Sequence, residues 1–425
     1  PVAVLVRFVE GPAVGGDTMR PLIVGGGPAG AAAAITLADR GVPSTVLERR
    51  PADRTPGSVC GGLLTPRASE ALAGLGVDAR DLGPAVDTIE LVAGPRRRRI
   101  NWPTTSEYPA VIASRERLER ELLARATLLG AEVRHGFEAL DPIIERGFVR
   151  GVRGLHDGAD TTIDTDLLLI ADGANSTFGR ALGTSRRLDW PTISSLRAMV
   201  PATGSVDAVA EFHLDLERGP GDGLPGFGWV FPTGDTMLNV GVQIASTARD
   251  AAAVNLHQLL EGLIDRVAPN HGITGDPSSL TEAAEGARTP VGDSIVPVAG
   301  PNFLVAGDAA GQASPLTGAG VESALLSGIE AGEVLTAATR TTAATLQDFV
   351  PRIRRLHGSH HKVARQIVRA TGRPLGARLL ARASTSGWGA ETVVRYALAE
   401  FRASGGAAEA IDAIANVLVR FAPEA

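Results

Sequence analysis

The sequence predicts an α/β protein: a Rossmann-like domain interrupted by an inserted antiparallel sheet and followed by a helical C-terminal region. Three observations predict it. Short apolar runs followed by helical patterns occur over residues 21–37, 107–170 and 301–335, as in parallel strands that helices cover. Residues 187–290 instead contain alternating extended segments, which are typical of an antiparallel sheet. From Thr336 onward the pattern is helical.

Composition bounds the function class. At 425 residues, with 44% hydrophobic and 21% charged residues, the chain has the length and composition of a globular protein with two or three structural units. The net charge of -6 gives no reason to expect a nucleic-acid partner. A single cysteine, Cys60, fits a reducing, cytoplasmic setting and predicts neither a disulfide framework nor a metal site. No apolar stretch is long enough to cross a bilayer, and residues 1–18 are assigned no function.

The first element is the run Pro21 to Val24, which meets a glycine cluster and then an alanine-rich helix. Gly25, Gly27 and Gly30 have the G-x-G-x-x-G spacing of a dinucleotide-binding turn, with Pro28 and Ala29 between them. Glycines allow the turn and the close approach of a pyrophosphate, and the helix amides face the phosphates. Glu48 ends the next apolar run, where a ribose-binding carboxylate is expected. We include its neighbour Arg49 in the predicted cofactor site.

A long loop rich in proline and glycine follows and contains Cys60, Gly61 and Gly62. The glycine pair permits a flat ligand ring to approach the backbone, but residue type alone favours a turn with a buried thiol.

Residues 88–102 predict a hairpin. Its run Arg96 to Arg99 could bind an anion, although a solvated strand is the favoured interpretation. Ser114 is the predicted N-cap of a helix. Further on, a helix near Val254 to Val267, a buried strand before Asp308 and a small-residue helix over Gly318 to Leu335 are expected.

Three separated motifs occur in a fixed order, and together they resemble the FAD-binding fold of the p-hydroxybenzoate hydroxylase class. They are the Gly25 turn with Glu48; Ala171-Asp172-Gly173 with Ser176 and Arg180; and Gly307-Asp308-Ala309-Ala310 with Pro315, Gly318 and Gly320. The resemblance implies that Asp308 accepts from ribityl hydroxyls and that the turn before Gly320 faces the flavin. It also implies that Asp172 and Arg115 lie at FAD.

Two further stretches resemble the geranylgeranyl reductase family within that class. These are Cys60-Gly61-Gly62-Leu63-Leu64-Thr65-Pro66-Arg67 and Pro225-Gly226-Phe227-Gly228-Trp229-Val230-Phe231-Pro232, followed by Asn239-Val240-Gly241. The family implies a catalytic loop, Cys60, Gly61 and Gly62, beside the isoalloxazine, and an isoprenoid cavity lined by Phe227, Trp229 and Phe231. The chain departs from the family pattern in two places, because Phe227 replaces a tyrosine and Leu63 a glycine.

The function that this resemblance implies is hydride transfer from reduced flavin to a carbon–carbon double bond of a hydrophobic, isoprenoid substrate. A flavin monooxygenase of aromatic or polyketide substrates and a flavin-containing non-redox cyclase stay open as alternatives. The flavin halogenases are less similar, since the lone lysine, Lys362, is not where they use one. The reductant is NAD(P)H or a protein donor. Basic residues of the C-terminal helices allow peripheral membrane contact, and the oligomeric state is open.

These patterns divide the chain into four parts. We assign residues 19–86, 107–184 and 291–345 to the FAD-binding domain, 87–106 and 185–290 to the substrate domain, 346–425 to the C-terminal helical region, and 1–18 to a leader.

Overall fold

The glycine turn joins the first strand of a five-stranded parallel sheet to the helix that follows it. A computed structural model describes residues 20–53, 59–102, 106–203, 208–234, 236–339 and 343–397, so the predicted leader lies outside the described residues. The strand order is β19-β11-β1-β2-β7, and every pairing is parallel. The strands are β1 (Leu22–Val24), β2 (Thr45–Glu48), β7 (Glu132–His135), β11 (Leu168–Ile170) and β19 (Phe303–Val305).

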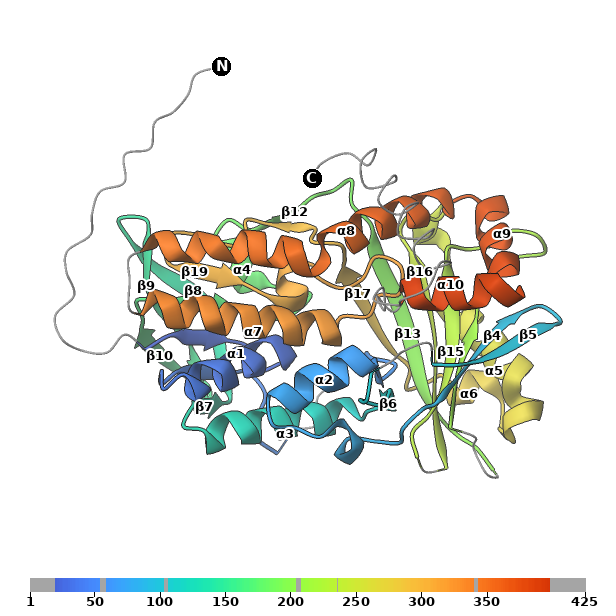
Figure 1. Cartoon of the computed structure of the whole chain (residues 1–425), viewed down its shortest axis with the longest axis horizontal. Coiled ribbons are helices and arrows are strands. Elements are labelled where there is room, and N and C mark those ends of the chain that lie inside the picture. Colours follow the sequence, from blue (N-terminus) through green and yellow to red (C-terminus); the bar gives the residue numbers. More distant parts are fainter. Residues whose placement is uncertain are drawn as a thin grey trace, which may run out of the picture.

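Different layers cover the two faces of this sheet (Figure 1). Ile23, Leu169 and Leu304 pack against the helical face. Leu22, Leu168 and Val305 share a core with residues of a three-stranded antiparallel sheet on the other face. The helices are α1 (Pro28–Asp39), α3 (Arg115–Leu128) and α7 (Val321–Ala338), and the second sheet consists of β8 (Phe137–Glu145), β9 (Phe148–His156) and β10 (Ala159–Asp164).

Small residues let α1 and α7 pack at close range. A Cβ atom on Gly328 would collide with the carbonyl oxygen of Ala29. The predicted small-residue helix is therefore present, but it begins at Val321, because Gly318 to Gly320 form the turn that precedes it.

The inserted sheet has seven strands in the order β17-β13-β16-β15-β14-β4-β5. All neighbours are antiparallel except β14 and β4, so the predicted hairpin joins the sheet through a parallel pairing far along the chain. Helix α5 (Leu256–His271) covers one face, with α6 (Pro277–Leu280) beside it. The strands are β4 (Thr88–Ala93), β5 (Arg96–Asn101), β13 (Thr192–Pro201), β14 (Val209–His213), β15 (Gly226–Pro232), β16 (Met237–Ala245) and β17 (Glu285–Pro290).

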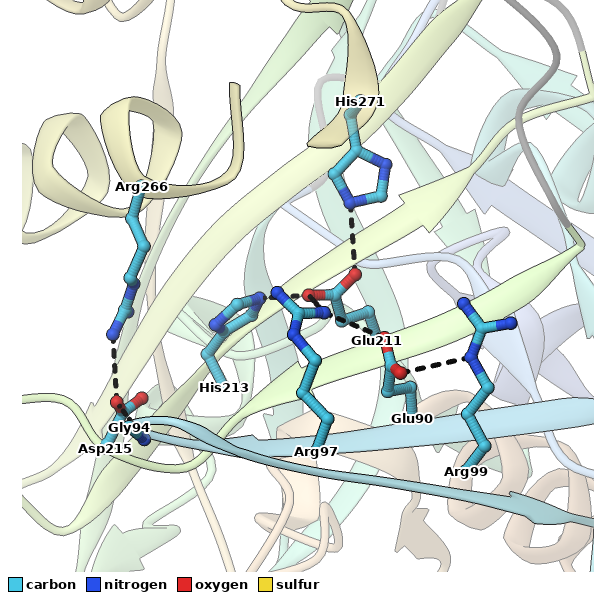
Figure 2. Close-up of polar contacts among 9 residues, drawn as sticks. All are labelled: Glu90, Gly94, Arg97, Arg99, Glu211, His213, Asp215, Arg266 and His271. Carbon is cyan, nitrogen blue, oxygen red and sulfur yellow. Dashed lines mark hydrogen bonds and ion pairs between the residues drawn. The ribbon is translucent and has the colours of Figure 1, made fainter. Parts of the chain in front are cut away.

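The arginines of β5 are exposed, as expected for a solvated strand, and two of them also form ion pairs. Arg97 lies 3.0 Å from Glu90 and 3.3 Å from Glu211, and Arg99 lies 3.0 Å from Glu90. His213 and His271 also contact the Glu211 carboxylate, at 2.7 and 3.0 Å (Figure 2). This polar cluster links β5 and the end of α5 to strands β4 and β14 of the sheet.

Three helices close the other face of the inserted sheet (Figure 1). They are α8 (Phe349–Ala370), α9 (Pro374–Ser384) and α10 (Gly387–Ala397). No helix in the described ranges is both long and apolar enough to span a membrane. The remaining elements are α2 (Pro66–Gly74), α4 (Thr177–Ala181), β3 (Leu63–Leu64), β6 (Val111–Ile112), β12 (Ser185–Arg186), β18 (Ile295–Val296) and 3₁₀ turns at Ala79–Asp81, Ala251–Ala253, Gly307–Ala310 and Ala343–Asp348.

Candidate active site

The three glycines of the first turn meet different surroundings. Gly25 has φ +106°, and a Cβ atom there would collide with the carbonyl of Ala171. A Cβ on Gly30 would collide with the carbonyl oxygen of Gly25. Apart from the neighbouring residues of its own chain segment, no protein atom lies within 4 Å of the Cβ position on Gly27. The first and third glycines therefore serve the packing of the turn, while the second leaves an open space at the start of α1, beside Pro28 and Ala29.

Glu48 ends β2 beside this turn and is nearly buried. It accepts hydrogen bonds from the Gly26 amide at 2.9 Å and from the Arg50 side chain at 2.8 Å. Burial opposes ionisation, but the hydrogen bond and charge of Arg50 outweigh it, so the pKa of Glu48 lies below its ordinary value. Arg50 thus occupies the place beside Glu48, whereas Arg49 is exposed.

Arg50 also links Glu48 to the start of α3. Its guanidinium lies 2.7 Å from Glu119, and Glu119 in turn lies 2.6 Å from Arg115. Burial lowers the pKa of Arg115, but the charges of Glu119, and beyond it Cys60 and Asp308, raise it above the ordinary value. Arg115 therefore stays charged between the glycine turn and the Asp308 motif.

Two carboxylates at the ends of parallel strands hold a buried oxygen without a partner. These atoms are Oδ1 of Asp172, after β11, and Oδ1 of Asp308, after β19. Burial raises the pKa of both carboxyls above the ordinary value, and only the Arg115 charge opposes it at Asp308. Buried polar atoms are normally hydrogen-bonded, so these two oxygens indicate a bound polar ligand. With the open Gly27 position, they fit the hydroxyl-rich chain and pyrophosphate of FAD.

The segment from Gly307 to Gly320 forms a turn that side-chain hydrogen bonds hold in place. The Gly307 amide donates to Gln312 at 2.7 Å, and Gln243 of β16 donates to the Thr317 carbonyl at 2.8 Å. Gly318 has φ +65°, and a Cβ on Gly320 would come within 2.8 Å of Asp308 Oδ1. No side chain caps the amides of α7, which begins at Val321. These amides supply partial positive charge at the end of the turn, next to Pro315 and Gly318.

The Cys60 loop is tied to the inserted sheet by one amide side chain. Asn239 of β16 donates to the carbonyl oxygens of Cys60 and Gly61, at 2.8 and 3.2 Å, and accepts from the Trp229 indole at 3.0 Å. The thiol of Cys60 accepts from the Gly62 amide at 3.3 Å. Gly62 has φ +85°, and a Cβ on it would come close to the Ala113 carbonyl. The loop is thus a backbone platform with little room for side chains.

The start of α2, which directly follows this loop, is anchored to α7. Thr65 donates to Glu322, and Arg67 lies 3.3 Å from the same carboxylate. The Cys60 loop and the turn before α7 are therefore held in a fixed relation.

Phe227, Trp229 and Phe231 lie on one face of β15, as strand alternation requires. A Cβ on Gly61 would come within 2.9 Å of Phe231, so the aromatic strand packs directly under the Cys60 loop. Gly241 is needed opposite Trp229, because any Cβ there would penetrate the indole. Trp229 and Phe231 are only 4% exposed and fill the space below the loop. Phe227 borders an open space instead.

That space is an apolar cavity of about 280 Å³. Pro315, Leu316 and Thr317 form one end of it, and Phe227 and Gln243 lie along the sheet. The other walls come from α8, α9 and α10, including Val363, Ile367, Leu380, Val394 and Tyr396. We refer to it as the apolar cavity. It connects the aromatic strand to the turn at Pro315, as in ligand sites with apolar walls and few polar groups.

Several site residues had no assigned role in the sequence analysis. Asn239, which belongs to the Asn239-Val240-Gly241 stretch, positions the loop, and Gln243 positions the turn. The signal for them was two polar residues on the same face of a buried strand. Arg50 and Glu119 had no comparable signal, because their ion pair joins distant segments.

The chain matches the family model described as FAD binding domain over residues 18–370. It is 32% identical over 323 residues to a menaquinone reductase of Mycolicibacterium smegmatis, covering 74% of this chain and 76% of that protein. It is 30% identical over 329 residues to digeranylgeranylglycerophospholipid reductase 1 of Methanopyrus kandleri, covering 74% and 79%.

Among solved structures, a geranylgeranyl bacteriochlorophyll reductase-like protein of Thermoplasma acidophilum superposes with a TM-score of 0.72 at 24% identity. The match covers 87% of this chain and 92% of that chain, and it confirms the predicted fold class. The glycine turn, the Asp308 motif and these relatives together place the protein in the FAD binding domain family, as an FAD-dependent oxidoreductase of the geranylgeranyl reductase family.

Proposed function

We propose that this oxidoreductase reduces a carbon–carbon double bond in a hydrophobic, isoprenoid substrate. The observation that carries the proposal is the apolar cavity, whose lining is mostly apolar and includes the Pro315 turn. The printed names of the relatives, menaquinone reductase and digeranylgeranylglycerophospholipid reductase, support the same substrate class.

The chain's own residues hold the cofactor in this proposal. The Gly27 position and the first amides of α1 bind the pyrophosphate, and Glu48 binds a ribose hydroxyl. Asp308 accepts from the ribityl chain, and Asp172 and Arg115 lie beside it. Once reduced, bound FAD supplies a hydride. NAD(P)H or a protein donor provides the electrons.

The substrate in this proposal lies along Phe227 in the apolar cavity, where apolar walls exclude bulk water from the reacting carbons. The second carbon needs a proton, and we assign it to a water at the Cys60 loop. The Cys60 thiol already accepts a hydrogen bond from the Gly62 amide. Phe227 carries no hydroxyl that could donate instead.

The test is the mass of the product formed from a polyprenyl quinone and from a geranylgeranyl lipid, with chemically reduced holoenzyme, in the presence and absence of oxygen. A gain of two hydrogens without oxygen that persists after any hydroquinone is reoxidised to the quinone supports the reductase. A gain of one oxygen atom that requires air overturns it in favour of a monooxygenase. An isomeric product of unchanged mass overturns it in favour of a cyclase.

A further inference from the structure

Helix α9 has apolar residues on two opposite faces. Ala377, Leu380, Ala381 and Ser384 of its inner face line the apolar cavity. On its outer face, Leu375 and Leu379 are 66% and 56% exposed, one helical turn apart. A surface helix normally has one apolar stripe facing the core, so this second stripe requires a separate explanation. The helix lies at the end of the molecule remote from the parallel sheet (Figure 1).

Arginines surround this outer face. A basin of about 960 Å³ adjoins α9, and its walls include Arg96, Arg378 and Arg382. Two other arginines of the basin are neutralised, Arg266 by Asp215 and Arg218 by Asp222. Within the described part of the chain, Arg96, Arg378 and Arg382 form no ion pair, and all three are exposed. The local charge is positive although the whole chain carries -6.

The basin and the apolar cavity share walls. Leu214, Leu224, Ala377 and Ala381 line both. The basin that the arginines line is therefore separated from the apolar cavity only by these shared wall residues. Helix α9 therefore carries the exposed leucines, two of the arginines and part of the cavity wall.

We propose that the outer face of α9, with Leu375, Leu379 and the arginines Arg96, Arg378 and Arg382, docks on an anionic lipid surface. Leucines enter the acyl boundary while the arginines contact lipid phosphates, the arrangement by which interfacial helices bind. The docking surface rests on exposure and charge alone. That the lipid surface delivers substrate into the apolar cavity rests on the proposed function.

The experiment measures co-sedimentation of the FAD-loaded full chain with phosphatidylglycerol vesicles and with phosphatidylcholine vesicles. The native protein should bind the anionic vesicles, and added salt should weaken this binding. The double variant Arg378→Gln and Arg382→Gln should bind about thirtyfold less, since each arginine near such a surface contributes about 1 kcal/mol. The double variant Leu375→Glu and Leu379→Glu should bind at least tenfold less.

Matched controls alter similar residues elsewhere. Leu188→Glu removes a leucine that is 84% exposed, and Arg354→Gln with Arg355→Gln removes two exposed charges of α8. These should bind like the native protein. Equal binding of native protein and α9 variants would overturn the proposal. So would a lowered melting temperature or altered self-association of the leucine variants, because the face would then be covered by this chain or by a second copy. No turnover is measured, so failure of the proposed function leaves this result interpretable.

Discussion

At the scale of single residues, two glycines of the same motif have different roles: Gly27 leaves space for a ligand, and Gly30 allows close packing. Gly27 has φ -70° and ψ -177°, a conformation that any residue adopts, and its side-chain position is empty of protein atoms. Gly30, in the same turn, has no such space. Residues that are identical in type and three apart in sequence therefore differ in what a substitution does.

We expect Gly27→Val to fold normally and to be purified without FAD, because the new side chain occupies the place of the pyrophosphate. Gly30→Val, the control, should fail to fold, since its Cβ collides with the Gly25 carbonyl. Flavin absorbance and circular dichroism distinguish the two outcomes. A yellow Gly27→Val protein with full FAD content would contradict the cofactor assignment.

Cys60 tests the source of the proton. If water donates, Cys60→Ala should retain double-bond reduction within about tenfold of the native kcat, whereas loss of a general acid costs roughly 10²- to 10⁴-fold. The same variant keeps the Asn239 hydrogen bonds, which use only carbonyl oxygens of the loop. Single-turnover oxidation of the reduced holoenzyme by substrate measures the step. A drop of a thousandfold with unchanged FAD content would assign the proton to the thiol.

At the scale of elements, local pattern predicted which segments are strands and helices, but pairing between distant segments gave the site its form. The motif glycines and the alternation of Phe227, Trp229 and Phe231 were readable, since each depends on neighbours a few residues away. The parallel pairing of β14 with β4 was not, because nothing in Val209 to His213 specifies a partner more than one hundred residues earlier. The ion pair of Arg97 with Glu211 was not readable for the same reason, whereas Glu90 faces Arg99 within the predicted hairpin itself.

The polar cluster in Figure 2 gives a pH-dependent prediction for this sheet. Burial opposes ionisation of Glu211, but hydrogen bonds from His213 and His271 and their charges hold its pKa far below the ordinary value. A depressed carboxyl pKa stabilises the fold above the pKa of the unfolded chain, about 4.3, and that stability is lost as the pH falls below it. Glu211→Gln should therefore lower the free energy of unfolding at pH 7 by about 3 kcal/mol and flatten its acid dependence.

Asp141→Asn is the control, because Asp141 pairs with Arg153 on the surface, where both side chains are about half exposed. Its effect should stay below about 1 kcal/mol. Urea unfolding between pH 2 and 7 measures both. Equal effects of the two substitutions would mean that the Glu211 cluster contributes no more than a surface pair.

At the scale of the whole molecule, the apolar cavity exists only because three parts of the chain meet. The inserted sheet supplies Phe227, the FAD-binding part supplies the Pro315 turn, and the C-terminal helices supply the remaining walls. The helical pattern after Thr336 was predictable from the sequence. Its apolar positions did not reveal which surface of the protein these helices pack against. The sequence therefore predicted a cavity at the aromatic strand without the helices that close it.

Ala381 tests whether this shared cavity holds the substrate. Its side chain is 5% exposed and lines the apolar cavity, so a large replacement should take up space that the substrate needs. We expect Ala381→Trp to keep its FAD and its melting temperature while kcat/KM for a long isoprenoid substrate falls at least tenfold. Ala383→Trp, on the exposed side of the same helix, should match the native enzyme in all three measurements. If Ala381→Trp turned over the substrate normally, the reacting chain would have to lie outside the cavity between the sheet and the C-terminal helices.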